Sequence, residues 1–515
     1  MSKTILLNHS NWHFTKENPG IPTAIMGEAI TLPHTWNAVD GQDGGNDYYR
    51  GTCWYTLALA KPAIPAGGKA ILQLDGAAMT AVVYLNGEKL AEHKGGYSTF
   101  RVDLTEHLKE ENLLAISVDN SDNDTVYPQK ADFTFYGGIY RDVTLHIVPA
   151  EHFALPANGA PALKVTPIVT DLAAKTVEVT VEAAVVGAQS VTFALEGQSI
   201  TAPAENGTAK AVFTLDNARL WDGVDDPFLY TVSAKLDNGE ETSARFGCRK
   251  FEFDPQKGFI LNGRSYPLRG VSRHQDRKGA GIALTNEMME EDISIILEMG
   301  ANTIRLAHYQ HAQYFYDLCD EKGLVIWAEI PYITMHMPNG RANPLTQMEE
   351  LLIQSYNHPC LNHPCIAVWG LSNEITAASA VNEDLLENHR LLNELAHKLD
   401  PIRKTTMANV FMLETTSPIL EIPDVNSYNL YFGWYLGELE QNDEFFDKYH
   451  ADYPDRCIGV SEYGPDANPQ YQSSHAASAF RSMAQMLTPS IRAATRKRAT
   501  TPRVTSAFTM SISQR

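Results

Sequence analysis

The amino-acid sequence predicts three successive domains: a jelly-roll β-sandwich, an immunoglobulin-like β-sandwich and a (β/α)8 TIM barrel that lacks its last unit. Three observations predict this multidomain β and α/β fold. The chain of 515 residues is long enough for several domains. Its first half contains short strand-like segments without helical periodicity. Its second half alternates strands with helices.

Residues 1–150 are expected to form the jelly roll. Residues 81–85 and 88–90 are strand-like segments joined by Asn86-Gly87. Asn-Gly tolerates the positive φ angles of a type I′ turn, so this stretch predicts a β-hairpin. Residues 113–118 and 143–148 have the composition of further strands. Many strands without helices indicate a sandwich.

Residues 151–248 are expected to form the immunoglobulin-like sandwich. Val177, Val179 and Val181 alternate with polar residues, and residues 230–234 repeat the pattern. Several short strands at regular spacing over roughly ninety residues are typical of that fold.

Residues 249–474 are expected to form the barrel. Thr285 is a predicted N-cap, and Gly300 lies where a helix-ending glycine belongs. Met289, Ile293 and Ile296 recur between them at helical spacing. Seven strands alternate with such helices, at residues 267–273, 302–306, 324–328, 366–374, 404–410, 425–429 and 457–461.

Residues 475–515 break the pattern. From residue 476 onward the chain has seven Lys or Arg and no Asp or Glu, whereas all 62 acidic residues precede that point. A disordered basic tail is one interpretation. We favour a replaced barrel end, as a frameshift would produce, because the eighth strand–helix unit is still missing. We therefore expect that the tail forms no eighth unit and that the chain is poorly active or unstable.

The composition excludes several classes of function. A net charge of −21 opposes binding to nucleic acids or anionic membranes. Scattered cysteines and the absence of a signal-like apolar segment predict a cytoplasmic protein with reduced thiols.

His358, Cys360, His363 and Cys365 could form a zinc tetrad, but they precede a barrel strand and so lie at the end away from the chemistry. We assign no metal ligands.

Two carboxylates emerge where apolar barrel strands end. Residues 366–372 form one such run before Asn373 and Glu374, and residues 457–461 form another before Glu462. Catalytic groups of a barrel lie at this face. A retaining glycosidase needs one carboxylic acid and one carboxylate a short distance apart. Asn373 either donates an amide hydrogen bond to a sugar hydroxyl or only ends the strand.

The sequence resembles glycoside hydrolase family 2, and most closely its β-galactosidases, over residues 1 to about 474. The resemblance is carried by an ordered set of motifs: Pro33-His34-Thr35-Trp36-Asn37, residues 44–51, residues 137–143, residues 268–274, residues 302–309, Asn373-Glu374 and Ser461-Glu462-Tyr463-Gly464.

The resemblance implies a retaining hydrolase that cleaves terminal β-D-galactosides by double displacement. Glu374 would be the acid/base, Glu462 the nucleophile and Tyr431 a hydroxyl bound to that nucleophile. The implied substrate-binding residues are Asn373, His308, His274, Asp132, Asn46 and Asp47.

The resemblance also implies sodium near Asp132 and, in some members, magnesium near the acid/base. The segment ending at His336 offers no second carboxylate for magnesium. Two alternatives stay open: a β-glucuronidase of the same family, and a non-catalytic carbohydrate-binding remnant. The expected partner is a β-galactoside substrate, with no nucleic acid and no membrane, and a homo-oligomer is compatible with the sequence.

Overall fold

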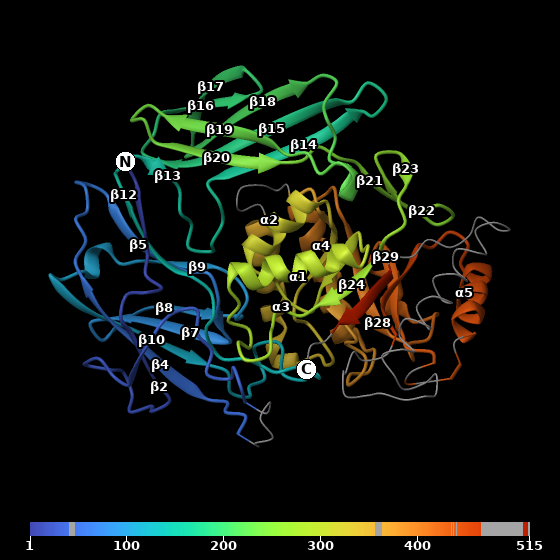
Figure 1. The fold of residues 1–515 in the computed structure, drawn as a ribbon, viewed down its shortest axis with the longest axis horizontal. Helices are drawn as coiled ribbons and strands as arrows, with labels where there is room; N and C mark the ends of the chain where they lie inside the picture. The colour runs from blue at the N-terminus through green and yellow to red at the C-terminus, as the bar shows by residue number, and fades with distance from the viewer. Residues whose placement is uncertain are drawn as a thin grey trace.

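The computed structural model describes residues 1–40, 47–355, 363–433, 435, 437–438 and 440–464, and the backbone of 508–512. Two β-sandwiches lie against a barrel, as the blue, green and yellow-to-red parts of Figure 1 show. Within this part of the chain, no helix combines the length and the apolar character needed to cross a membrane.

The first domain is a sandwich of antiparallel sheets. One sheet has the order β1-β12-β5-β9 and the other β3-β2-β4-β10-β7-β8, with a small β11-β6 pair. The strands are β1 (Lys3–Leu6), β2 (Trp12–Thr15), β3 (Glu28–Ile30), β4 (Thr52–Ala60), β5 (Lys69–Leu74), β6 (Ala77–Ala78), β7 (Thr80–Leu85), β8 (Glu88–Lys94), β9 (Phe100–Asp103), β10 (Glu111–Asp119), β11 (Gly138–Ile139) and β12 (Val143–Val148). The β7–β8 hairpin is confirmed, and Asn86 and Gly87 have φ of 54° and 84°.

The second sandwich buries the alternating valines predicted from the sequence. Val177, Val179 and Val181 are all fully buried. Its strands are β13 (His152–Phe153), β14 (Leu163–Asp171), β15 (Thr176–Val186), β16 (Ser190–Leu195), β17 (Gln198–Glu205), β18 (Thr208–Leu215), β19 (Tyr230–Leu236) and β20 (Glu241–Phe246). A hairpin of β21 (Phe251–Asp254), β22 (Gly258–Leu261) and β23 (Arg264–Ser265) then leads into the barrel.

The barrel is a closed ring of parallel strands in chain order. The strands are β24 (Arg269–Arg273), β25 (Thr303–Leu306), β26 (Val325–Glu329), β27 (Ile366–Asn373), β28 (Lys404–Val410), β29 (Val425–Leu430), β30 (Ile458–Tyr463) and β31 (Phe508–Ile512). The helices around them are α1 (Asn286–Glu298), α2 (Gln313–Lys322), α3 (Ala342–Ser355), α4 (Glu383–Leu399) and α5 (Gln441–Asp452).

Local signals explain where the first helices begin and end. The Thr285 side chain accepts a hydrogen bond from the Met288 N–H and so caps α1. Gly323 ends α2 in the left-handed conformation with φ of 75°. Gly300, the glycine predicted to end α1, follows the C-cap Met299 with φ of 77°, so Thr285 and Gly300 both lie where the sequence predicts them.

The expectation that the tail forms no eighth unit is wrong as regards the strand of that unit. Strand β31, the red arrow beside β24 in Figure 1, pairs in parallel with β24 and with β30 and closes the ring. Phe508, Met510 and Ile512 alternate with Thr509 and Ser511, the period-two pattern of a strand. Because the hydrogen bonds between neighbouring strands come from the backbone, a strand of five residues is enough to close the ring. Residues 475–507 and 513–515 of the basic tail lie outside the described residues.

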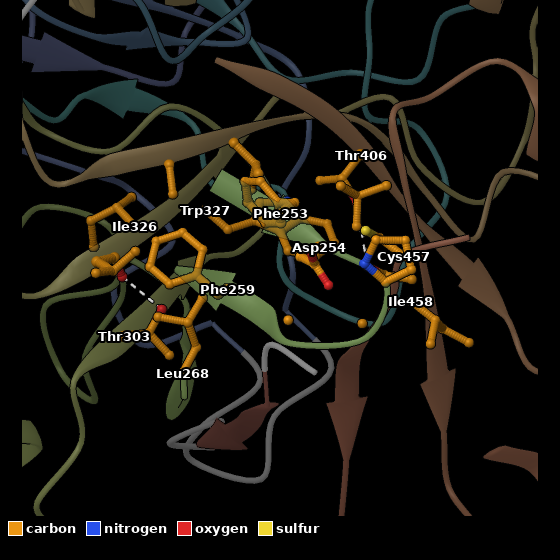
Figure 2. A pocket seen from close by; sticks show the side chains of 18 of the residues that line it. Phe253, Asp254, Phe259, Leu268, Thr303, Ile326, Trp327, Thr406, Cys457 and Ile458 are labelled. Atoms are coloured by element: carbon orange, nitrogen blue, oxygen red, sulfur yellow. Dashed lines mark hydrogen bonds between the residues drawn. The ribbon is translucent and has the colours of Figure 1, made fainter. Parts of the chain in front are cut away.

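A hollow lies at the amino-terminal end of the barrel. It encloses about 690 Å³ of space not filled by atoms, part of it open to solvent. Figure 2 shows Phe253 and Phe259 of the β21–β22 hairpin beside Ile326 and Trp327. Its lining includes the first residues of four strands, namely Thr303, Val325, Val425 and Ile458. The hollow is therefore on the face opposite Glu374 and Glu462.

The first domain packs against the barrel through buried contacts. The rings of Tyr97 and Tyr309 stack with centroids 4.2 Å apart. Arg141 donates a buried hydrogen bond of 2.8 Å to the carbonyl of Gln310. These contacts hold the loops of the sandwich over the carboxyl-terminal face of the barrel.

Candidate active site

Glu374 and Glu462 both lie at the carboxyl ends of barrel strands. Glu374 follows β27 directly, and its φ of 46° turns the chain out of the strand direction. Glu462 lies near the end of β30. Asn429 of β29 connects the two strands, because it donates to Glu374 Oε1 at 3.0 Å and accepts from Ser461 Oγ at 2.6 Å.

Both oxygens of Glu462 have a donor. Arg305 Nη1 donates to Oε1 at 2.5 Å, and the Tyr431 hydroxyl donates a hydrogen bond to Oε2. The side chain is almost completely buried. Two donors, one of them cationic, stabilise the ionised carboxylate.

Arg305 and Glu329 form a fully buried ion pair beside this carboxylate. Arg305 Nε and Nη2 donate to the two oxygens of Glu329 at 2.9 and 2.8 Å. Arg305 Nη2 also donates to Asn373 Oδ1 at 2.9 Å. The guanidinium therefore connects strands β25, β26, β27 and β30 in one network.

The two glutamates differ in their electrostatic surroundings. Burial, and then the negative charge of Glu462, raises the pKa of Glu374 to about 7. A carboxyl group with this pKa is partly protonated at neutral pH, as a general acid must be. Burial and the same negative charge raise the pKa of Tyr431 far above its usual value, so it remains a hydroxyl. Burial opposes the charge of Arg305, but Glu329 and Glu462 outweigh it and raise the pKa of the guanidinium.

The structure brings both predicted histidines to this face. His308 Nε2 is 3.8 Å from Glu462 Oε1, and the rings of His274 and His308 have centroids 5.1 Å apart. Phe133 of the first domain lies against both, at 5.0 Å from the His274 ring and 5.9 Å from the His308 ring. Its neighbour Asp132 is exposed. The jelly-roll loop that carries Asp132 therefore lies at the barrel mouth.

The second jelly-roll loop is described only in part. Asp47 is exposed, and the hydroxyl of the next residue, Tyr48, donates to the carbonyl of Phe135 at 2.9 Å. This bond holds the two loops together. Asn46 lies outside the described residues.

The described residues do not fit a magnesium site at His336. Its Nδ1 is 2.6 Å from the Tyr332 hydroxyl, and its Nε2 is 2.7 Å from Asp384 Oδ2. Asp384, on α4, also binds Arg341. Asp384 is a carboxylate near His336 that the segment ending at His336 does not itself contain. Both nitrogens of His336 are nevertheless engaged in hydrogen bonds, so neither is available to a metal ion.

Among the described residues, one group of potential metal ligands gathers, namely Asp320, His363 and Cys365. His363 Nδ1 is 2.5 Å from one oxygen of Asp320, and the Cys365 N–H donates to the other at 3.1 Å. Asp320, on α2, thus binds the segment that precedes β27, at the end of the barrel away from Glu374 and Glu462. His358 and Cys360 lie outside the described residues.

Sequence reasoning missed Arg305, Glu329 and Asn429. Glu329 ends an apolar strand as Glu374 does, so the same signal was present for it. Arg305 is a cation within an apolar strand, which predicts a buried partner. Asn429 gave no such signal, because amides are common at strand ends.

Comparison with known families agrees with this geometry. The model described as "Glycosyl hydrolases family 2, sugar binding domain" matches residues 17–149, and "Glycosyl hydrolases family 2" matches residues 157–249. "Glycosyl hydrolases family 2, TIM barrel domain" matches residues 255–485. The three matches follow one another in the order of the two sandwiches and the barrel.

Two relatives of this chain are named for activity on different sugars. The chain is 34% identical over 499 residues to a β-glucuronidase of Bacteroides fragilis, which covers 91% of this chain and 69% of that protein. It is 31% identical over 403 residues to a β-galactosidase of Thermoanaerobacter pseudethanolicus, which covers 73% of this chain and 51% of that protein. The chain thus spans between half and about two thirds of the length of these relatives.

Solved structures show the same fold. An FMN-binding β-glucuronidase from Facaelibacterium prausnitzii L2-6 is 39% identical, with a TM-score of 0.89 over 99% of this chain and 79% of that one. A putative β-galactosidase from Bacteroides fragilis is 30% identical, with a TM-score of 0.86 and the same coverage. Domain matches along most of the chain, sequence identity and shared fold agree: this chain belongs to glycosyl hydrolase family 2.

Proposed function

We propose that the protein is a retaining glycoside hydrolase that cleaves terminal β-D-glucuronides, with Glu374 as acid/base and Glu462 as nucleophile. The observation that carries the proposal is the contrast between the two carboxyl groups. Glu374 has a pKa raised to about 7 by burial and by Glu462, whereas Glu462 accepts hydrogen bonds from Arg305 and Tyr431. A double displacement needs one protonated and one ionised carboxyl group.

In the first step, a carboxylate oxygen of Glu462 attacks the anomeric carbon while the bond to the aglycone oxygen breaks. Glu374 gives its proton to the departing oxygen, so the aglycone leaves as a neutral alcohol. Glu462 becomes the ester of a glycosyl-enzyme and loses its negative charge.

In the second step, Glu374 is ionised and accepts a proton from water. The resulting nucleophile attacks the anomeric carbon, and the bond to Glu462 breaks. The electron pair returns to Glu462, and Arg305 and Tyr431 again face a carboxylate. The sugar leaves with its original configuration.

The preference for glucuronides rests on relatives. A β-glucuronidase of Bacteroides fragilis and a putative β-glucuronidase of Formosa agariphila are 34% and 35% identical to this chain. A galactoside is the second candidate, for two reasons. A named β-galactosidase is 31% identical, and the loop of Asp132, an anionic residue that disfavours a uronic acid, lies at the barrel mouth.

Turnover of paired nitrophenyl glycosides tests the proposal. We expect kcat/KM for the β-D-glucuronide to exceed that for the β-D-galactoside by at least about tenfold. The reverse order would select the second candidate. Binding of the sugars without any turnover would support a carbohydrate-binding protein instead.

Asp132→Ala tests the second candidate directly. If Asp132 accepts a hydrogen bond from a galactose hydroxyl, the variant should lower kcat/KM for galactosides by roughly tenfold and affect glucosides much less, because discrimination depends on the group left unpaired. Asp124→Ala, which removes an exposed carboxylate of the same domain that binds Asn339, is the matched control. Equal losses on both sugars would give Asp132 a structural role.

A further inference from the structure

The Arg305 guanidinium lies between two carboxylates, and only one of them can react. Arg305 is fully buried, and it donates two hydrogen bonds to Glu329 and one to Glu462. Glu329 is also fully buried. If Glu462 were the only carboxylate beside Arg305, the positive charge of Arg305 would cancel the negative charge of the nucleophile.

From this arrangement we propose that Glu329 is a positioning residue that serves as the permanent counter-ion of Arg305. Before the reaction, Glu329 balances the charge of Arg305, so Glu462 keeps its negative charge. After Glu462 has become an ester, Glu329 keeps Arg305 paired. This inference rests on the double displacement proposed above. Glu329 would not touch the sugar and would act through Arg305 and His308.

The first consequence concerns the free enzyme. Because both oxygens of Glu329 accept from Arg305, the pair is close to neutral, and Glu462 adds a net negative charge to the cluster. That charge stabilises the positive charge that develops on the sugar in the transition state. Without Glu329, the charge of Arg305 would cancel that of Glu462.

The second consequence concerns the glycosyl-enzyme. When Glu462 forms the ester, Arg305 loses that carboxylate as a partner. A buried charge without a partner is strongly unfavourable. Glu329, which forms no bond to the sugar, still accepts two hydrogen bonds from Arg305 at this stage, so the intermediate does not contain an isolated cation.

Glu329 also orients His308. His308 Nδ1 is 2.8 Å from Glu329 Oε1, and since an ionised carboxylate only accepts, Nδ1 carries the proton in this bond. His308 Nε2 then lies on the side of Glu462, 3.8 Å from Oε1. Glu329 thus sets the tautomer of a ring at the sugar-facing end of the barrel.

The neighbouring strand leaves space for Glu329. Gly370 of β27 is paired with Glu329 of β26. A Cβ at Gly370 would lie 2.5 Å from Glu329 Cβ and 2.5 Å from Trp327 Nε1. A side chain at position 370 would therefore displace Glu329, and the glycine keeps the carboxylate within reach of Arg305.

The variant Glu329→Gln removes the charge and keeps the size. Asp400→Asn is the matched control, because Asp400 is equally buried and pairs with Arg403 elsewhere in the barrel. Glu329→Asp keeps the charge and serves as the conservative variant. Rates are measured in single turnovers with a dinitrophenyl β-D-glucuronide, and sites are counted with a fluorosugar that traps the glycosyl-enzyme.

We expect Glu329→Gln to slow formation of the glycosyl-enzyme by about 100-fold per counted site and to slow its hydrolysis much less. The acidic limb of kcat/KM should move to lower pH, because Arg305 then acts on Glu462 alone. Glu329→Asp should recover much of the rate, and Asp400→Asn should lose stability without a change in the pH profile.

Two failures are distinguishable. If wild-type protein neither turns over nor is labelled by the fluorosugar or its galactose counterpart, the proposed function fails, and this inference fails with it. If the wild type is active but Glu329→Gln has the same rates per site and the same pH profile, Glu329 is only structural and the inference is overturned while the function stands.

Discussion

Glu462→Ala should abolish turnover, with kcat reduced by about 10⁵-fold or more. The variant removes the group that would form the covalent bond, and it leaves Arg305 and Tyr431 without the carboxylate that both contact. Glu329 cannot substitute, since both of its oxygens are bound to Arg305. The measurement is the steady-state rate with a dinitrophenyl glycoside.

Azide should partly restore this variant. The shortened side chain leaves room for a small anion on the face from which Glu462 would attack, so the product should be a glycosyl azide of inverted configuration. Asp424→Ala is the control, because Asp424 precedes β29 at the opposite end of the barrel. A rate for Glu462→Ala within tenfold of wild type would rule out Glu462 as the nucleophile.

Glu374→Ala should depend strongly on the leaving group. Substrates with poor leaving groups need the proton and should lose about 10³-fold or more in kcat/KM, whereas dinitrophenyl glycosides should lose far less. Azide should here give a product of retained configuration, since the lost function is that of the base in the second step. Product analysis by NMR separates this outcome from that of Glu462→Ala.

The pH profile gives an independent check on Glu374. Its pKa is raised to about 7 by burial first and by Glu462 second, so wild-type kcat/KM should fall as the pH rises through about 7 and the proton donor ionises. This basic limb should vanish in Glu374→Ala. A basic limb that stays in place in the variant would assign the titration to another group.

Periodicity and strand-end chemistry predicted much of this molecule. The Asn86-Gly87 hairpin, the Thr285 cap and the positions of Glu374 and Glu462 follow from local rules, because turn conformation, capping and the polarity of a barrel depend on few neighbouring residues. The family resemblance has the same origin, since its motifs are short and contiguous. The domain matches confirmed the family, whereas the galactose preference is less well supported by the relatives.

Two features depended on the tertiary structure. The composition of the tail argues against an eighth strand, yet the backbone of β31 pairs with β24 and β30, which only the closed ring brings to a suitable distance. The network of Arg305 with Glu329 and Glu462 joins β25 and β26 to β30, which is 157 residues further along the chain. The sequence shows that these residues are charged. Their pairing depends on the distances between side chains, which are set only when the barrel has folded. These distances decide which carboxylate stays paired with Arg305 and which can react.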